Sequence, residues 1–190
     1  MTAIERIHDL LEAEGYEPTL AAVEGKPTSI SPLIVPFRPD AGGREMALFI
    51  EVMPREAGET TSLINFSLIY PYELYDAEHL GELVRALFLL NRYVPVGSHG
   101  LCEQTPAVYF FHALVVSDAE TVDEEVIRET VSMIGFTTRR HGPFIRRVLT
   151  GEANCDNLLE ELAMTGELLP PLFARTLRDS EDAAAEQSNG

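Results

Sequence analysis

Histidine and cysteine side chains are the first candidates for chemistry, because they bind metals and transfer protons. The five histidines are scattered along the chain: His8, His79, His99, His112 and His141. None of them has a partner at the four-residue spacing with which a helix chelates a metal. The one local group of possible ligands is His99, Cys102 and Glu103. A closed zinc site takes four ligands, so this group is incomplete and the sequence predicts no metal and no cofactor.

Carboxylates and nucleophiles give no clearer catalytic pattern. Acidic pairs such as Glu124 with Glu125 fall on expected helix surfaces, whereas catalytic pairs face each other in a cleft. The chain has no nucleophile elbow and no phosphate-binding or dinucleotide-binding glycine loop. We therefore expect a protein that is not an enzyme. The alternative is an enzyme whose cleft assembles from His99, Glu103 and His112.

A basic island interrupts this acidic chain, formed by Arg139, Arg140, Arg146 and Arg147. It could dock an acidic partner or a phosphate. The simpler interpretation is that these cations pair with nearby carboxylates at a helix end, where the helix dipole also favours them.

Composition excludes several functions. The chain has 190 residues, 45% of them hydrophobic, and a formal net charge of −17, which opposes binding to nucleic acid or to an anionic membrane. The longest nearly apolar run, Ala107 to Val116, is about half of the roughly 20 residues that a membrane helix needs. Two cysteines make no disulfide framework, and the start lacks an apolar leader, so we expect a cytoplasmic protein.

The first half of the chain predicts one helix followed by strands. Thr2 and Glu5 have the spacing of a capping box, and apolar residues then recur at helical spacing up to Gly15. Three strand candidates follow, around Leu33–Val35, Met46–Val52 and Ile64–Tyr70. Ile64, Phe66, Leu68 and Tyr70 share one face of the last strand, with Asn65 and Ser67 on the other, as expected for a sheet with one buried face.

A second helix is expected from Asp76 to about Asn91. Its core stripe has the i, i+3, i+4 spacing and consists of Leu80, Leu83, Val84, Leu87 and Phe88. Ala86, Leu89 and Leu90 lie to one side of that stripe, where an isolated domain prefers polar residues. We therefore predict that these three residues form a homodimer interface.

The second half predicts a hairpin and further helices. Its arms are Val96–Glu103 and Ala107–Val116, and the second arm is apolar on both faces, so we expect it inside the sheet. A helix should follow from Val122 to Ile134, with Pro143 breaking or kinking the helical region beyond it. We expect one domain over residues 1–150, a helical extension over 151–178 and a disordered acidic tail over 179–190.

This order of elements, with two short motifs, resembles the YbjN and type III secretion chaperone-like family. The motifs are Leu10–Tyr16, which closes the first helix, and Leu89–Gly97, which closes the second. The resemblance covers about residues 1–150. It implies an α+β fold, with an antiparallel sheet of about five strands and flanking helices in the order α-β-β-β-α-β-β-α, and a non-catalytic cytoplasmic protein. The secretion chaperones are dimers that hold a partner segment in extended form.

We therefore expect a dimeric, chaperone-like or regulatory module that binds a protein partner. A structural subunit of a larger complex is a further alternative. The strand around Leu33 is bracketed by Pro32 and Pro36, which suit a sheet edge. Leu33, Val35 and Phe37 are the predicted partner-binding residues, because an extended segment could add a strand there. The alternative is that both prolines block such pairing.

Overall fold

The computed structural model describes residues 2–21, 31–37, 44–53, 61–73, 79–102, 107–117, 119–121 and 123–164. The elements in chain order are α1 (Ala3–Ala13), β1 (Thr19–Leu20), β2 (Leu33–Phe37), β3 (Met46–Met53), β4 (Ser62–Glu73), α2 (Leu80–Leu90), β5 (Ser98–Cys102), β6 (Ala107–Val116), the short 3-10 helix η3 (Ala119–Thr121), α3 (Glu124–Leu149) and α4 (Cys155–Met164). The predicted extension over residues 151–178 is described as far as residue 164. The predicted tail over residues 179–190 lies outside the described residues.

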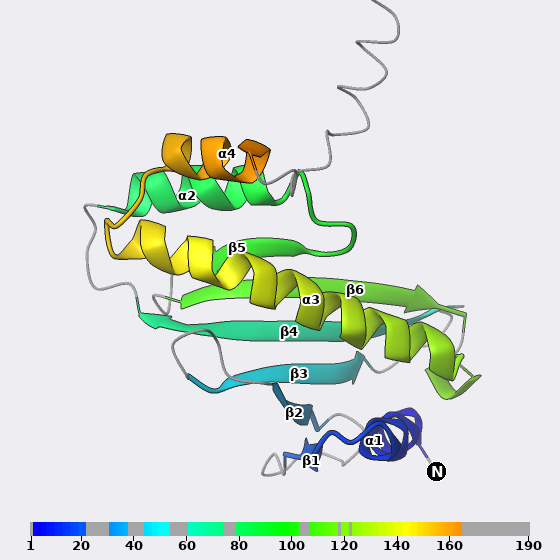
Figure 1. Ribbon diagram of the computed structural model, residues 1–190. Coiled ribbons are helices and arrows are strands. Elements are labelled where there is room, and N and C mark those ends of the chain that lie inside the picture. The colour runs from blue at the N-terminus through cyan, green and yellow to red at the C-terminus, as the bar shows by residue number, and fades with distance from the viewer. Residues whose placement is uncertain are drawn as a thin grey trace, which may run out of the picture.

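Six strands form one open antiparallel sheet in the order β1-β2-β3-β4-β6-β5 (Figure 1). This confirms the predicted α+β class. The expected sheet of about five strands gains a sixth because the two residues of β1 pair with the start of β2, with Thr19 opposite Ile34. The second hairpin arm is β6, and it lies inside the sheet between β4 and β5, as its two apolar faces predicted.

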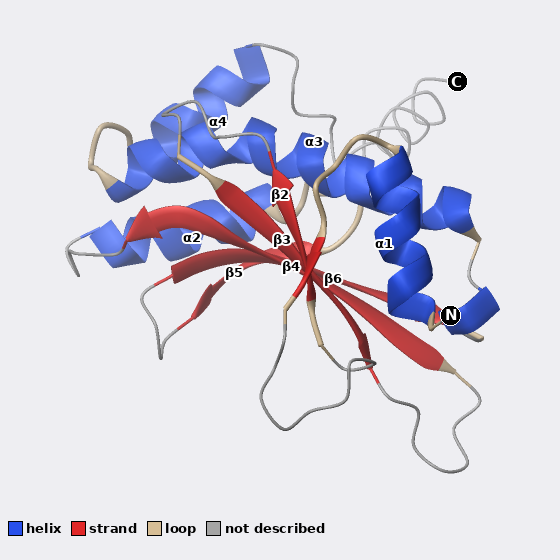
Figure 2. Ribbon diagram, turned by 90° about the horizontal axis from the view of Figure 1, so that it is seen from below, coloured by secondary structure: helices blue, strands red, loops and turns tan. Residues whose placement is uncertain are grey.

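The helices lie to one side of the sheet (Figure 2). α3 runs across the strands, and α2 contacts the edge strand β5 and carries α4 on its outer surface. Alternate residues of each strand point toward the helices and are buried, among them Leu48, Ile50, Phe66 and Phe110. The core therefore fills the space between one sheet face and the helix layer. No helix in the described ranges is long and apolar enough to cross a membrane.

Helix α1 begins with the predicted capping box. The Glu5 amide donates to the Thr2 hydroxyl, and the Thr2 amide donates to a Glu5 carboxylate oxygen at 2.7 Å. Two amides that the helix leaves without an internal acceptor are satisfied in this way. The helix then buries Ile4, Ile7 and Leu11.

Helix α2 buries a different stripe from the predicted one. Leu83 and Leu87 lie in the core as expected, but Val84 and Phe88 are exposed, Phe88 by 71%. Ala86 and Leu90 take their place and are only 2% and 3% exposed. Apolar residues lie on more than one side of this helix. Their spacing alone therefore does not determine whether the stripe with Phe88 or the stripe with Leu90 is buried.

Helix α3 is one helix of 26 residues and continues through Pro143, so the predicted break there is wrong. It begins at the Asp123 side chain, which accepts from the Glu125 amide at 2.9 Å. Packing holds the helix in place on both sides of the proline, since Ile145 and Val148 are buried beyond it and two glycines pack closely before it. Gly135 touches the Phe37 ring, and Gly142 lies against Tyr70 and Tyr72, so a larger residue at Gly135 would collide with Phe37.

Candidate functional site

Two histidines that are far apart in the sequence meet inside the protein. His99 Nε2 on β5 lies 2.8 Å from His141 Nδ1 on α3, and the Tyr70 hydroxyl lies 3.3 Å from His99 Nδ1. Asn91, at the end of α2, fixes the backbone of His99. The Asn91 side-chain Nδ2 donates to the His99 carbonyl at 2.9 Å, and the Asn91 Oδ1 accepts from the His99 backbone N–H at 2.7 Å. The histidine pair therefore links the sheet edge to two helices.

This pair is closed to solvent, with His99 and His141 only 4% and 5% exposed. Burial, with the neighbouring His141, lowers the pKa of His99 to about 3. Burial, with the nearby Arg140 charge, lowers the pKa of His141 to about 4. Both rings are therefore neutral near pH 7, and each can donate one hydrogen bond and accept another. The arrangement suits an internal hydrogen-bond chain, because a general base needs access to its substrate.

Two members of the alternative catalytic group, His99 and His112, lie in the described part of the chain. His112 stacks on Phe66 at a ring distance of 6.0 Å, while His99 packs edge-on against Phe110 and bonds to His141. Glu103 lies outside the described residues. The enzyme alternative therefore stays a prediction.

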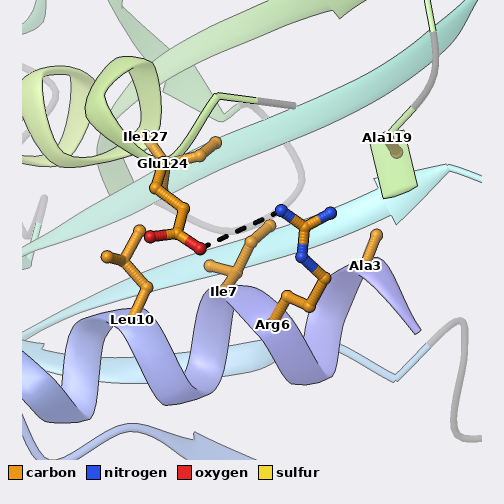
Figure 3. Close-up of a pocket in the computed structure, with 7 residues that line it drawn as sticks. All are labelled: Ala3, Arg6, Ile7, Leu10, Ala119, Glu124 and Ile127. Carbon is orange, nitrogen blue, oxygen red and sulfur yellow. Dashed lines mark ion pairs between the residues drawn. The ribbon is translucent and has the colours of Figure 1, made fainter. Parts of the chain in front are cut away.

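A small hollow opens between α1 and the start of α3 (Figure 3). Ile7, Leu10 and Ile127 contribute to its mainly apolar lining, and Arg6 and Glu124 approach to 4.0 Å at its rim. Its empty volume of about 210 Å³ includes space open to solvent. Sites for small molecules usually enclose roughly 300–1,000 Å³. We therefore assign no ligand to this hollow.

The described residues contain one group with metal-ligand geometry, formed by His8, Asp9 and Glu12 on α1. The His8 ring already bonds to the Asp9 carboxylate at 3.1 Å, and both acidic residues are exposed. Exposed carboxylates on a helix are ordinarily solvated.

We predict that folding requires no metal. Elemental analysis of purified protein should find no stoichiometric metal, and a chelator should leave the melting temperature unchanged. A stoichiometric metal whose removal lowers the melting temperature would contradict this prediction.

The basic island forms the surface of α3 near its end. Arg147 donates two bonds to Glu161 of α4, at 2.7 and 3.0 Å, and Arg146 lies 3.5 Å from Glu152. The Arg140 guanidinium lies over the Phe136 ring at 5.7 Å. The pairing of Arg146 and Arg147 with carboxylates favours the simpler interpretation, and Arg147 also links α3 to α4.

The second face of the sheet, away from the helices, is covered by no helix among the described elements (Figure 2). In β2, β3, β4, β6 and β5, every second residue lies on this face, and the strand register aligns these residues in cross-strand rows. Two neighbouring cross-strand rows carry most of its apolar side chains, and we call them the open-face patch: Ile34, Ala47, Phe49, Ile69, Tyr109 and Phe111. Ile69 is 49% exposed although it lies on a central strand. Exposed apolar surfaces of this kind commonly mark protein contacts.

The open face has a second apolar row at one end of the strands. Met53, Leu63 and Val115 are opposite one another on β3, β4 and β6, and Val115 is 64% exposed. A row containing Glu51 and Asn65 separates it from the open-face patch. The Tyr109 ring covers Gly100 of β5 and occupies the space that a side chain at Gly100 would take. The face is thus apolar at both ends and polar between them.

The predicted partner-binding residues point the other way. Leu33, Val35 and Phe37 are buried under the helix layer, so none of them can contact a partner in this structure. The prediction assigned the buried face of β2 to a partner, and a shift of one residue exchanges the two faces of a strand.

The outer edge of β2 also offers little room for an added strand. The Ala21 N–H already donates to the Pro32 carbonyl at 2.9 Å, and β1 pairs with Ile34. Backbone groups of alternate residues point to the same side, so the next outward position in β2 is Pro36, which has no N–H. This geometry favours the interpretation in which the prolines block pairing.

The predicted dimer residues also require correction. Ala86 and Leu90 lie in the core of their own chain, and Leu89 is half-buried against it. Ala86 and Leu90 are therefore unavailable to a second copy. Self-association itself stays a prediction, and it needs a different surface.

The sequence contains a signal for the open face. Ala47 and Phe49 are apolar between the buried residues of β3, and β6 is apolar on both faces. Such strands fit a sheet that is buried on both sides. In the described residues only one side is covered.

No model of a known protein family matches the chain, and no curated protein matches it. The resemblance to the YbjN and type III secretion chaperone-like family therefore stays a prediction.

Proposed function

We propose that this chain is a non-catalytic protein-binding module, chaperone-like or regulatory, that acts as a dimer. The observation that carries the proposal is the open-face patch, a partly exposed apolar surface on the sheet of an otherwise acidic protein. Burying an apolar surface contributes roughly 25 cal/mol per Å², so such a face favours contact with another apolar surface.

The shape of the open face favours a protein over a metabolite. A small molecule is usually held in a concave pocket, whereas a pleated sheet face is broad and presents side chains from several strands. Ile69, Tyr109 and Phe111 come from two neighbouring strands and stand side by side. Aromatic residues are also enriched among those that contribute most to protein interfaces.

The mode of binding differs from our expectation from sequence. An extended segment pairing with β2 would meet Pro36, so we place the partner on the open face instead of the sheet edge. The partner supplies an apolar surface complementary to Phe49 and Ile69.

Capture from native lysate tests this proposal. The bait proteins are the wild type, Ile69→Glu on the open face and Phe88→Glu on α2. Ile69 and Phe88 are both exposed apolar residues, so the second variant controls for the loss of surface hydrophobicity. We expect Ile69→Glu to lose at least about nine-tenths of the captured partner, because a buried unpaired charge at an interface costs several kcal/mol.

The Phe88→Glu bait should capture the same partner as the wild type. Circular dichroism establishes that each variant is folded before the comparison. A partner that binds Ile69→Glu as well as the wild type would contradict the proposal, and loss of binding in Phe88→Glu alone would move the interface to α2.

A further inference from the structure

We propose that in the purified protein a second copy of this chain covers the open-face patch, so that two sheets stack face to face. This inference depends on the proposed function, because it assigns the same surface to a second copy, which another protein partner then replaces. It commits to a homodimer with two-fold symmetry, in which each open face contacts the other.

The distribution of charge favours a second copy at this surface. With a net charge of −17, two copies repel each other over most orientations. Four cross-strand rows of the open face pass through every second residue of β4 from Leu63 to Ile69. They contain one charged side chain, Glu51. This neutral area allows two acidic molecules to approach with the least like-charge contact.

The size of the face is also suitable. Five strands from β2 to β5, about 4.8 Å apart, give a width of roughly 20–25 Å. Leu63 to Ile69 adds a length of about 20 Å along β4. The flat area is therefore roughly 400–500 Å² per copy, and the standing side chains increase the area that becomes buried. Stable interfaces bury about 800 Å² per partner, so the flat area alone supplies roughly half of a standard interface.

The rows of the open face define how two copies fit. Stacked sheets keep their strands within about 30° of each other and pack about 10 Å apart. A two-fold axis near Ser67 places the open-face patch of one copy on that of the other. Glu51 lies in the row next to the open-face patch, so each copy places one carboxylate beside the patch. The patch at the centre of the interface contains no charged side chain.

Sedimentation velocity of the full chain from low to high micromolar concentration tests this inference. We expect the wild type and Phe88→Glu to sediment as dimers and Ile69→Glu as a monomer. The dissociation constant should rise at least about a hundredfold in Ile69→Glu, because a two-fold interface contains the substitution twice.

Salt provides a second readout. Added salt screens the repulsion between the two acidic copies, so the dimer should tighten as ionic strength rises. A dimer that salt weakens would be held by ion pairs and would overturn the inference. Loss of the dimer in Phe88→Glu but not in Ile69→Glu would also overturn it.

The two proposals fail in different ways. A monomeric wild type whose Ile69→Glu variant still loses its captured partner contradicts the homodimer in both proposals and leaves partner binding by the open face intact. If Ile69→Glu changes neither sedimentation nor capture, both proposals are wrong.

Discussion

Acidification from pH 7 to pH 5 is expected to destabilise this protein by about 4 kcal/mol through two buried histidines. Burial lowers the pKa of His99 to about 3 and that of His141 to about 4. In the unfolded chain both groups titrate near 6.5. Below that value the unfolded state binds protons that the folded state does not, so the free energy of unfolding falls.

The size of this effect follows from linkage. Each pH unit below the unfolded pKa costs about 1.36 kcal/mol per histidine, which gives about 2 kcal/mol for each ring at pH 5. The contribution is complete above about pH 6.5 and is lost as the pH falls toward the folded pKa values. Since total stabilities are about 5–15 kcal/mol, the loss is large.

Urea unfolding at pH 7, 6 and 5 measures this dependence. A double variant, His99→Gln with His141→Gln, removes both titrating groups and should flatten the pH profile, even if it is less stable at pH 7. His8→Gln on the surface of α1 is the control and should keep the wild-type slope. An unfolding free energy that does not fall between pH 7 and pH 5 would contradict the closed histidine pair.

Leu90→Glu is expected to unfold the protein, whereas Phe88→Glu leaves it folded. Leu90 is 3% exposed and packs in the core, so its replacement creates a cavity and buries a carboxylate. Together these effects should cost at least about 4 kcal/mol. Phe88, two residues earlier on the same helix, is exposed, and its replacement should change stability by less than about 1 kcal/mol.

Thermal unfolding of the two variants distinguishes the core stripe found here from the one that the sequence predicted. The predicted stripe places Phe88 in the core and Leu90 outside it, and so requires the opposite result. A folded Leu90→Glu variant together with an unfolded Phe88→Glu variant would show that α2 is rotated relative to this structure.

Local signals in the sequence were sufficient for much of the fold. The Thr2 and Glu5 pair marks the start of α1, because each side chain satisfies a specific amide. The alternation in β4 is visible between Ile64 and Tyr70, and it correctly predicted which residues are buried. Patterns of this kind depend on neighbours within one element, so a single sequence contains them.

Positions that depend on packing between elements could not be predicted. His99 and His141 are 42 residues apart, and only the path of α3 across the sheet brings them together. The rotation of α2 depends on the positions of β5 and α3, because its apolar residues allow either stripe. Pro143 stays within α3 because tertiary packing of Gly135 and Gly142 holds the helix on the sheet.

The open face was missed for a related reason. A strand with two apolar faces indicates two contacts, but a single sequence does not say which contact belongs to the chain itself. In β2 the apolar run predicts a partner contact at Leu33 and Val35. In the structure these two residues lie in the core, and Ile34 lies on the open face.

Hydroxyl-radical footprinting tests the central claim, that the open face is the protein-contact surface, most directly. The protein is labelled when dilute and when concentrated or bound to its captured partner. We predict that Met53, Tyr109 and Phe111 lose most of their reactivity in the associated state, while Phe88 and Phe136 on the helices keep theirs. Protection of Phe88 and Phe136 with unchanged labelling of Met53, Tyr109 and Phe111 would contradict the claim and place the interface on the helix layer.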